Sequence, residues 1–142
     1  MKFAVFSIGD QFFTEPVIVT EADIIEFGQK YDPQYFHVDK QSAEQGPFGT
    51  LIASGFHTLA VVWSEWIKMD ILGKDCLGGV GADKIRWKKP VQANDLLAGQ
   101  FTVLNKKEAS NGKRGLLTLE VMIKNQREEE VLTCSTSVFI EV

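Results

Sequence analysis

The stretch that most constrains the fold of this chain is residues 55–69. Apolar side chains recur there with the period of an α-helix, and further apolar residues extend round the other side. The main apolar face consists of Leu59, Val62, Trp63, Trp66 and Ile67. Because a helix that is apolar on most of its faces is normally buried, we expect the rest of the chain to enclose it. Its two tryptophans are assigned to the core.

The second half of the chain has the pattern of half-buried β-strands. Apolar and polar residues alternate over residues 84–88, 97–103, 117–123 and 132–140. Asn111-Gly112 is a strong hairpin signal between the second and third of these runs. The pattern predicts an antiparallel meander, one face of which the apolar helix covers. The expected fold class is therefore α+β, with a curved antiparallel β-sheet wrapped around a central apolar helix.

The N-terminal third is predicted to contain a short strand and two helices. The β-branched residues 17–19 favour an edge segment. Thr20 is placed to cap a helix that ends near Gly28, and Asp39 is able to cap a second, short helix. Residues 30–50 are otherwise rich in turn signals. Irregular segments of this length are uncommon in small domains unless they have a function.

Length and composition set the remaining bounds. With 142 residues, we expect one domain over residues 1–142. The net charge of −4 argues against general nucleic-acid binding, which needs a basic surface, but it leaves room for a local basic patch. The longest apolar stretch, residues 56–67, is interrupted by polar residues and is shorter than the roughly 20 residues that span a membrane. We therefore expect neither a nucleic-acid nor a membrane partner.

The chain also lacks the signals of secretion. The N-terminal apolar region is too short for a signal peptide. The two cysteines, Cys76 and Cys134, do not have the spacing of a metal or redox pair. We expect a cytoplasmic protein with reduced thiols.

Residues 31–43 contain the pattern most suggestive of chemistry. Asp32 precedes His37 by five positions, and Pro33 keeps the chain between them out of a helix. A turn of this kind can direct both side chains at one point, where a carboxylate and an imidazole form a general acid–base pair around one water. Tyr31, Tyr35 and Phe36 would keep that point partly dry.

Three collinear segments resemble the MaoC-like dehydratases, the hot-dog-fold group that includes the (R)-specific enoyl-CoA hydratases. They are Asp32-Pro33-Gln34-Tyr35-Phe36-His37 with Asp39 and Ala43, then Phe48-Gly49-Thr50-Leu51-Ile52-Ala53-Ser54-Gly55, then Ile85-Arg86-Trp87-Lys88-Lys89-Pro90-Val91 with Asn94-Asp95. Two positions depart from the hydratase form: Pro33-Gln34 often reads as a variable residue and Asn-Pro, and Ser54 is often His.

The resemblance implies a hydro-lyase of fatty acid metabolism. It would add or remove water across the 2,3 double bond of an acyl-CoA thioester and form the (R)-3-hydroxyacyl-CoA. Asp32 and His37 take the catalytic positions, and the Gly55 N–H takes that of an oxyanion donor. A single His–Asp pair is no metal-ligand set, so no metal is expected, and coenzyme A enters only as part of the substrate.

Further expectations concern how the substrate is held and how the chain assembles. The thioester is expected near Ser54 and Gly55 at the start of the apolar helix. The acyl tail is expected in a tunnel walled by Tyr35, Phe36, Phe48 and Leu51. Lys84, Arg86 and Lys88 share one face of the strand predicted at 84–88 and could meet the phosphates of coenzyme A. A meander around one helix leaves sheet edges unpaired, which predicts a homodimer.

Several alternatives remain open at this point. The chain could be a hot-dog thioesterase, or a non-catalytic acyl-CoA-binding or scaffold subunit. Asp32 could simply cap a turn, and His37 could be an ordinary turn histidine. Ser54 could be a plain helix cap, and the three basic side chains could form a solvated strand face. His57, early on the apolar helix, is interpreted as a packed residue.

Overall fold

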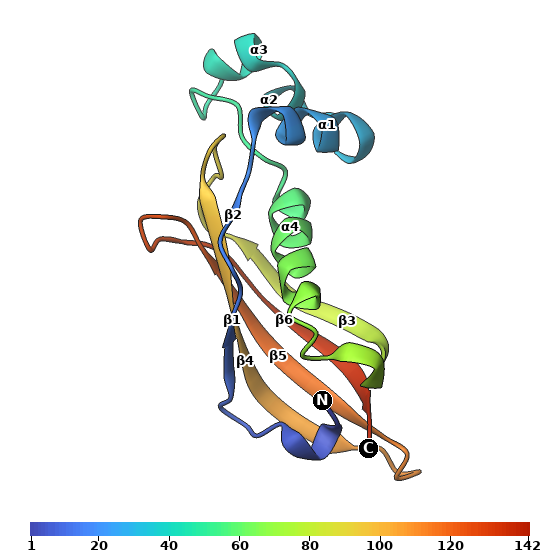
Figure 1. Ribbon diagram of the computed structural model, residues 1–142. Coiled ribbons are helices and arrows are strands. Elements are labelled where there is room, and N and C mark those ends of the chain that lie inside the picture. The colour runs from blue at the N-terminus through green and yellow to red at the C-terminus, as the bar shows by residue number, and fades with distance from the viewer.

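The computed structural model describes residues 1–142 as a six-stranded antiparallel sheet and four α-helices (Figure 1). The strands are β1 (Gln11–Phe13), β2 (Val17–Ile18), β3 (Cys76–Trp87), β4 (Leu96–Glu108), β5 (Arg114–Lys124) and β6 (Glu130–Glu141). The helices are α1 (Glu21–Tyr31), α2 (Tyr35–Val38), α3 (Lys40–Glu44) and α4 (Gly55–Lys68), with 3₁₀ turns at Phe3–Val5 and Gly73–Asp75. The order in the sheet is β1-β4-β5-β6-β3, and β2 pairs with β4.

Helix α4 packs across the curved sheet, as the sequence predicts. Figure 1 shows α4 lying along the face of the sheet towards which the strands bend. Its buried residues include Val62 and Trp66, and the indole of Trp66 stacks on the ring of Phe101 in β4 with centroids 4.4 Å apart. The core is one cluster of 23 buried apolar residues. The expected α+β class and the sheet around a central apolar helix are therefore confirmed.

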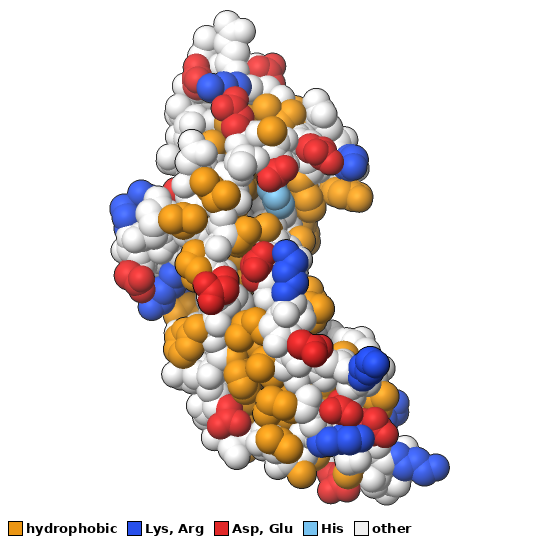
Figure 2. Space-filling view, in the orientation of Figure 1, with side chains coloured by type: hydrophobic (Ala, Val, Ile, Leu, Met, Phe, Trp, Pro, Cys, Tyr) orange, Lys and Arg blue, Asp and Glu red, His pale blue; other side chains and the backbone are white.

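The expectation that α4 is enclosed is wrong for this chain alone. Phe56 and Ile67 are about half exposed, at 56% and 48%. A groove of about 460 Å³ separates the outer side of α4 from β3 and β6, and on β3 it is lined only by Gly79, Gly81 and Ala82. These residues have small side chains or none, so β3 cannot fill the space beside the helix. Figure 2, drawn in the orientation of Figure 1, shows hydrophobic side chains gathered over the lower half of the molecule.

Strand β3 is longer and less regular than its sequence indicates. It begins at Cys76, within a glycine-rich stretch that carries no strand signal. Opposite β6, Asp83 pairs with Ser135 but Arg86 pairs with Thr133, so β3 contains one extra residue there. Lys84 lies in this β-bulge with a φ of 55°. The bulge breaks the alternation, and the prediction that Lys84, Arg86 and Lys88 share one face is wrong.

The other predicted elements occur close to where they are expected. Residues 17–18 form the edge strand β2, and Thr20 caps α1 by accepting a hydrogen bond from the Asp23 N–H at 3.1 Å. Asp39 caps α3 through the Ser42 N–H, also at 3.1 Å. Asn111-Gly112 lies in the β4–β5 hairpin. No helix is long and apolar enough to cross a membrane.

Helices α1, α2 and α3 form a separate layer at one end of the molecule (Figure 1). The chain returns from them to α4 through an extended segment at residues 50–54. In that segment the Ile52 N–H donates to the Phe36 carbonyl at 3.0 Å, and the Ala53 N–H donates to the Val91 carbonyl at 2.8 Å. The segment therefore ties the helical layer to the end of the sheet, and the space between these two parts holds the candidate site.

Candidate active site

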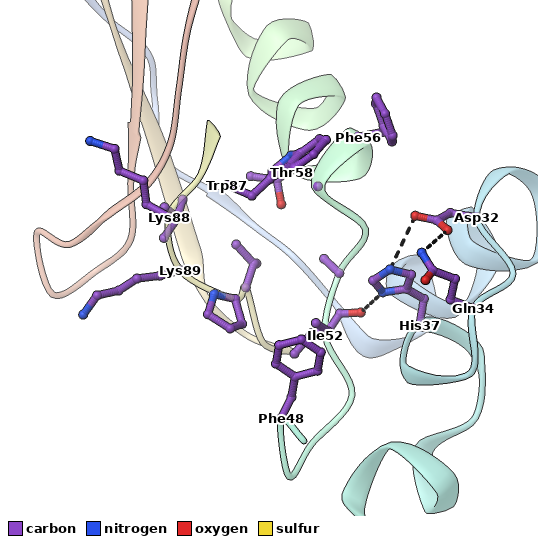
Figure 3. A pocket seen from close by; sticks show the side chains of 15 residues that line it. Asp32, Gln34, His37, Phe48, Ile52, Phe56, Thr58, Trp87, Lys88 and Lys89 are labelled. Carbon is purple, nitrogen blue, oxygen red and sulfur yellow. Dashed lines mark hydrogen bonds and ion pairs between the residues drawn. The ribbon is translucent and has the colours of Figure 1, made fainter. Parts of the chain in front are cut away.

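A pocket of about 490 Å³ opens between the helical layer and the end of the sheet (Figure 3). Asp32, Gln34 and His37 line it on the side of the helices. Lys88 and Lys89 lie on the opposite side, just beyond β3. The other lining residues are Phe48, Ile52, Ala53, Gly55, Phe56, Thr58, Trp87, Pro90, Val91 and Val131. The pocket thus has a carboxylate and an imidazole at one end and two ammonium groups at the other.

A close approach between α1 and α2 brings Asp32 and His37 together. Asp32 terminates α1, and its N–H donates to the Gly28 carbonyl at 2.9 Å. His37 lies on α2, one turn beyond Pro33. A methyl group at Gly28 would lie 2.9 Å from Cγ1 of Val38 and 3.0 Å from Cβ of His37. Glycine is therefore needed for α2 to pack this closely on α1. The two side chains meet, as predicted, but the turn is shorter than expected, because Tyr35–Val38 form α2 and His37 therefore lies on a helix.

The protonation of the His37 ring is fixed by its contact with the backbone. Nδ1 lies 2.6 Å from the carbonyl oxygen of Ile52, and the side chain is 5% exposed. A carbonyl oxygen only accepts hydrogen bonds, so Nδ1 must carry the proton. In the neutral ring Nε2 is then unprotonated and acts as an acceptor. This nitrogen faces Asp32 at the edge of the pocket (Figure 3).

Asp32 is held as a carboxylate by two donors. The Gln34 amide donates to Oδ1 and the Ser54 hydroxyl donates to Oδ2, each at 2.8 Å. Partial burial opposes ionisation, but these hydrogen bonds, and the positive charge of His37 when its ring is protonated, outweigh it. Together they lower the pKa of Asp32 below its ordinary value of 3.8. Asp32 is thus charged at neutral pH, and its side chain does more than cap a turn.

The spacing of the two groups suits a shared water. Nε2 of His37 and Oδ2 of Asp32 are 3.4 Å apart. With the ring neutral, both atoms are acceptors and cannot hydrogen-bond to each other, whereas a water has two hydrogens to donate, one to each. A water held in this way would have a base against it at the start of a reaction.

The start of α4 supplies free backbone donors to the same pocket. Ser54 is at the cap position, but its hydroxyl is directed to Asp32 and makes no hydrogen bond to the helix. The first backbone bond at this end runs from the Thr58 N–H to the Ser54 carbonyl at 3.1 Å. The N–H groups of Gly55 and Phe56 consequently have no acceptor in the chain. Such groups, together with the helix dipole, favour negative charge.

The basic residues of the pocket differ from those predicted. Lys88 lines it, as expected, but Lys84 and Arg86 do not, because the bulge turns that part of β3 away. Lys89, which sequence analysis omitted, takes their place. Lys88 lies 3.6 Å from Glu130, and Lys89 pairs with Glu129. Hydrogen bonds from Lys89, Asn125 and Arg127 lower the pKa of Glu129 to about 2.

Some of the predicted wall residues support the pocket without lining it. Phe48 is on its surface. Phe36 packs edge-on against His37 and Phe48, with centroids 4.6 and 5.3 Å apart. Tyr35 packs on Phe36 and does not line the pocket, and Leu51 is buried in the core at 3% exposure. Tyr35, Phe36 and Leu51 thus do not line this pocket, and a tunnel walled by them stays a prediction.

Other lining residues were missed by sequence analysis. Gln34 had a usable signal, since an amide two residues after Asp32 can reach back to it. Trp87 lies within the third family-like segment and Phe56 directly follows the second, and a large aromatic side chain at such a position is a weaker signal. Val131 had none, because β6 reaches the pocket only through the tertiary fold.

His57 is a packed residue, as interpreted. Its ring stacks on Phe27 with centroids 4.7 Å apart and is 8% exposed. Burial lowers the pKa of His57, and the nearby Asp23 only partly offsets this effect. His57 does not line the pocket that contains Asp32 and His37.

A model of the MaoC-like domain family matches residues 5–125 of this chain. The fold is the one that the sequence resemblance led us to expect. The chain therefore belongs to the MaoC-like domain family.

Relatives support this assignment over different lengths. The uncharacterised protein YdeM of Bacillus subtilis is 37% identical over 99% of each chain. A 3-hydroxyacyl-thioester dehydratase of Mycobacterium tuberculosis is 31% identical over 68% of this chain and 65% of its own length. The crystal structure of a MaoC-like dehydratase from Rhodospirillum rubrum has 29% identity and a TM-score of 0.91, covering 99% of this chain and 97% of that one. This match confirms the hot-dog fold.

Proposed function

We propose that the protein is a hydro-lyase that adds or removes water across the 2,3 double bond of an acyl-CoA thioester. The observation that carries the proposal is the hydrogen bond from His37 Nδ1 to the Ile52 carbonyl, which leaves an unprotonated Nε2 beside the Asp32 carboxylate. Membership of the MaoC-like family and the dehydratase relative support the same reaction class. The (R) configuration of the 3-hydroxyacyl product is inherited from the family resemblance.

In the proposed hydration, the shared water attacks the β-carbon of the enoyl thioester. One O–H bond breaks as the new C–O bond forms, and Nε2 of His37 takes the proton. The Asp32 carboxylate orients the water and stabilises the imidazolium. The same proton then passes from Nε2 to the α-carbon, so that the elements of one water have been added. Dehydration follows these steps in reverse.

The electron pair displaced from the double bond accumulates on the thioester oxygen. We propose that the Gly55 N–H at the start of α4 donates to that oxygen. Its lack of any acceptor within the chain supports this role. Ser54 is then a positioning residue, because it acts through its hydrogen bond to Asp32.

The coenzyme A end of the substrate is proposed to lie beside Lys88 and Lys89. Both ammonium groups are across the pocket from Asp32 and His37, where they would meet phosphate charge. No other cofactor is proposed.

We also propose that the protein acts as a homodimer joined at β3. This 12-residue strand is an edge of the sheet, and all of its residues except Cys76 and Ile85 are exposed. A long unpaired edge that carries exposed Leu77 and Val80 suits pairing with a second copy.

A single assay distinguishes the candidate functions. The protein is incubated with a crotonyl-to-octenoyl-CoA series, while loss of the enoyl-thioester absorbance and release of thiol are followed in parallel. We expect loss of absorbance without thiol. Release of thiol would instead indicate a thioesterase, and no change with any substrate would indicate a binding or scaffold subunit.

A further inference from the structure

The indole of Trp87 lies directly on the start of α4. A methyl group built at Gly55 would overlap its Nε1, Cδ1 and Cε2 atoms. The indole also meets the ring of Phe56 edge-on, with centroids 5.3 Å apart. Trp87 is nevertheless 51% exposed and lines the pocket, so its contacts are with the site and not with the core.

The bulge in β3 is what directs Trp87 to this position. Trp87 pairs with Leu132, which is fully buried, and cross-strand partners point to the same face of a sheet. Without the extra residue at Lys84, the alternation that runs through Asp83 would send the Trp87 side chain to the opposite face. Bulges often redirect a side chain near a functional site.

The place of the indole relative to the helix determines what it can do. Cα–Cβ bonds in a helix tilt towards the N-terminus. A group that occupies the Cβ position of Gly55 therefore stands beside the free N–H groups of the first turn. Figure 3 shows the Trp87 side chain beside the start of α4, on the side of the pocket where Lys88 lies.

We propose that Trp87 is a positioning residue that covers the start of α4 and packs against the thioester group of a bound acyl-CoA. The inference rests on the proposed function and specifies which side chain excludes water from the oxyanion donor, the Gly55 N–H. A hydrogen bond to developing negative charge is worth more where water is excluded. Trp87 also explains why residue 55 is glycine, since any side chain there would collide with the indole.

The first test measures contact without turnover. Butyryl-CoA, a saturated analogue, is titrated into wild type and Trp87→Phe while tryptophan emission and binding heat are recorded. We expect wild-type emission to change on binding, and most of that change to be lost in Trp87→Phe although heat is still released. Binding without an emission change in wild type, or an equal change in Trp87→Phe, would overturn the inference.

The second test separates kcat from KM on crotonyl-CoA. For Trp87→Ala we expect kcat to fall by less than the roughly 10²–10³-fold cost of losing an oxyanion donor, with little change in KM or in the pH profile. Trp87→Phe should restore most of kcat, and Trp87→Leu serves in place of Trp87→Ala if that variant unfolds. A wild-type kcat in both aliphatic variants, or a rise in KM alone, would overturn the inference.

A pair of helix-start variants tests the contact itself. Gly55→Ala should lower the melting temperature because of the overlap with the indole, and Trp87→Ala in that background should recover it. If Gly55→Ala lowers the melting temperature by the same amount in the wild type and in the Trp87→Ala background, the contact is contradicted. A protein that gives the emission change with butyryl-CoA but hydrates no enoyl-CoA would contradict the proposed function and leave the Trp87 contact standing.

Discussion

Nε2 of His37 lies 3.4 Å from Oδ2 of Asp32, although neither atom can donate to the other while the ring is neutral. The two atoms can lie this close because each side chain is held by hydrogen bonds to other groups. The Ile52 carbonyl holds the ring, and Gln34 and Ser54 hold the carboxylate. Two acceptors held this close together leave a place for a donor, which the proposed mechanism assigns to water.

Removing either member of this pair should abolish most activity. Asp32→Asn and His37→Ala are each expected to lower kcat by a factor of about 10²–10⁴, the usual contribution of a general acid–base group. The measurement is hydration of crotonyl-CoA, with circular dichroism to verify folding. Asp70→Asn is the matched control, because this residue is exposed, outside the pocket, and has a φ of 58° that asparagine tolerates. Near-wild-type turnover in either site variant would contradict the pair.

Removing the Ser54 hydroxyl should raise the pKa of Asp32. Its hydrogen bond stabilises the charged carboxylate and so helps to hold that pKa below 3.8. A depressed carboxyl pKa stabilises the fold above the unfolded pKa, and this stability is lost as the pH falls through the folded pKa. In Ser54→Ala the carboxyl titration and the acid limb of the rate should both move to higher pH.

The carboxyl ¹³C signal of Asp32 measures the titration directly. Ser64→Ala is the control, since Ser64 is exposed on α4, the helix that Ser54 precedes. An unchanged Asp32 titration in Ser54→Ala would show that the hydroxyl does not tune the carboxylate.

The close packing of α1 on α2 should be sensitive to one methyl group. Gly28→Ala is expected to displace α2, because Val38 and His37 lie within 3.0 Å of the added carbon. Overpacking of this kind costs about 1–3 kcal/mol of stability, and the shift of His37 should also lower kcat. Urea unfolding and turnover are compared with Gln29→Ala, an exposed neighbour on α1. Wild-type values for both quantities would show that the glycine is not needed for the approach.

Phe48 and Leu51 should give opposite results, since only Phe48 lines the pocket. Phe48→Ala is expected to shift kcat/KM towards longer acyl-CoAs, by at most about 0.8 kcal/mol per additional buried methylene. Leu51→Ala should leave the chain-length profile unchanged but destabilise the fold by about 2–5 kcal/mol, as for other buried leucines. An unchanged profile in an active Phe48→Ala would mean that the tail lies elsewhere.

The sequence was sufficient for the geometry of the site where local rules decide it. Pro33 and the short spacing of Asp32 and His37 indicated that the two side chains meet, and periodicity identified α4 and the strands β4, β5 and β6. The prediction of one shared face for Lys84, Arg86 and Lys88 failed because a single extra residue at Lys84 reverses the faces of β3. The sequence around Lys84 contains no signal of a bulge. The Ile52 carbonyl could not be foreseen either, since it is a backbone group that reaches His37 only through tertiary structure.

The exposed edge of β3 should make assembly sensitive to charge. If two copies pair there, Val80→Lys places an ammonium group in the middle of the joint strand pair, and inward charge at an edge opposes pairing. We expect wild type to be a dimer at micromolar concentration by light scattering and Val80→Lys to shift towards monomer. Ile8→Lys is the control, because Ile8 is also more than half exposed but lies outside β3. A monomeric wild type, or a Val80→Lys variant that stays dimeric, would show that β3 is not the interface.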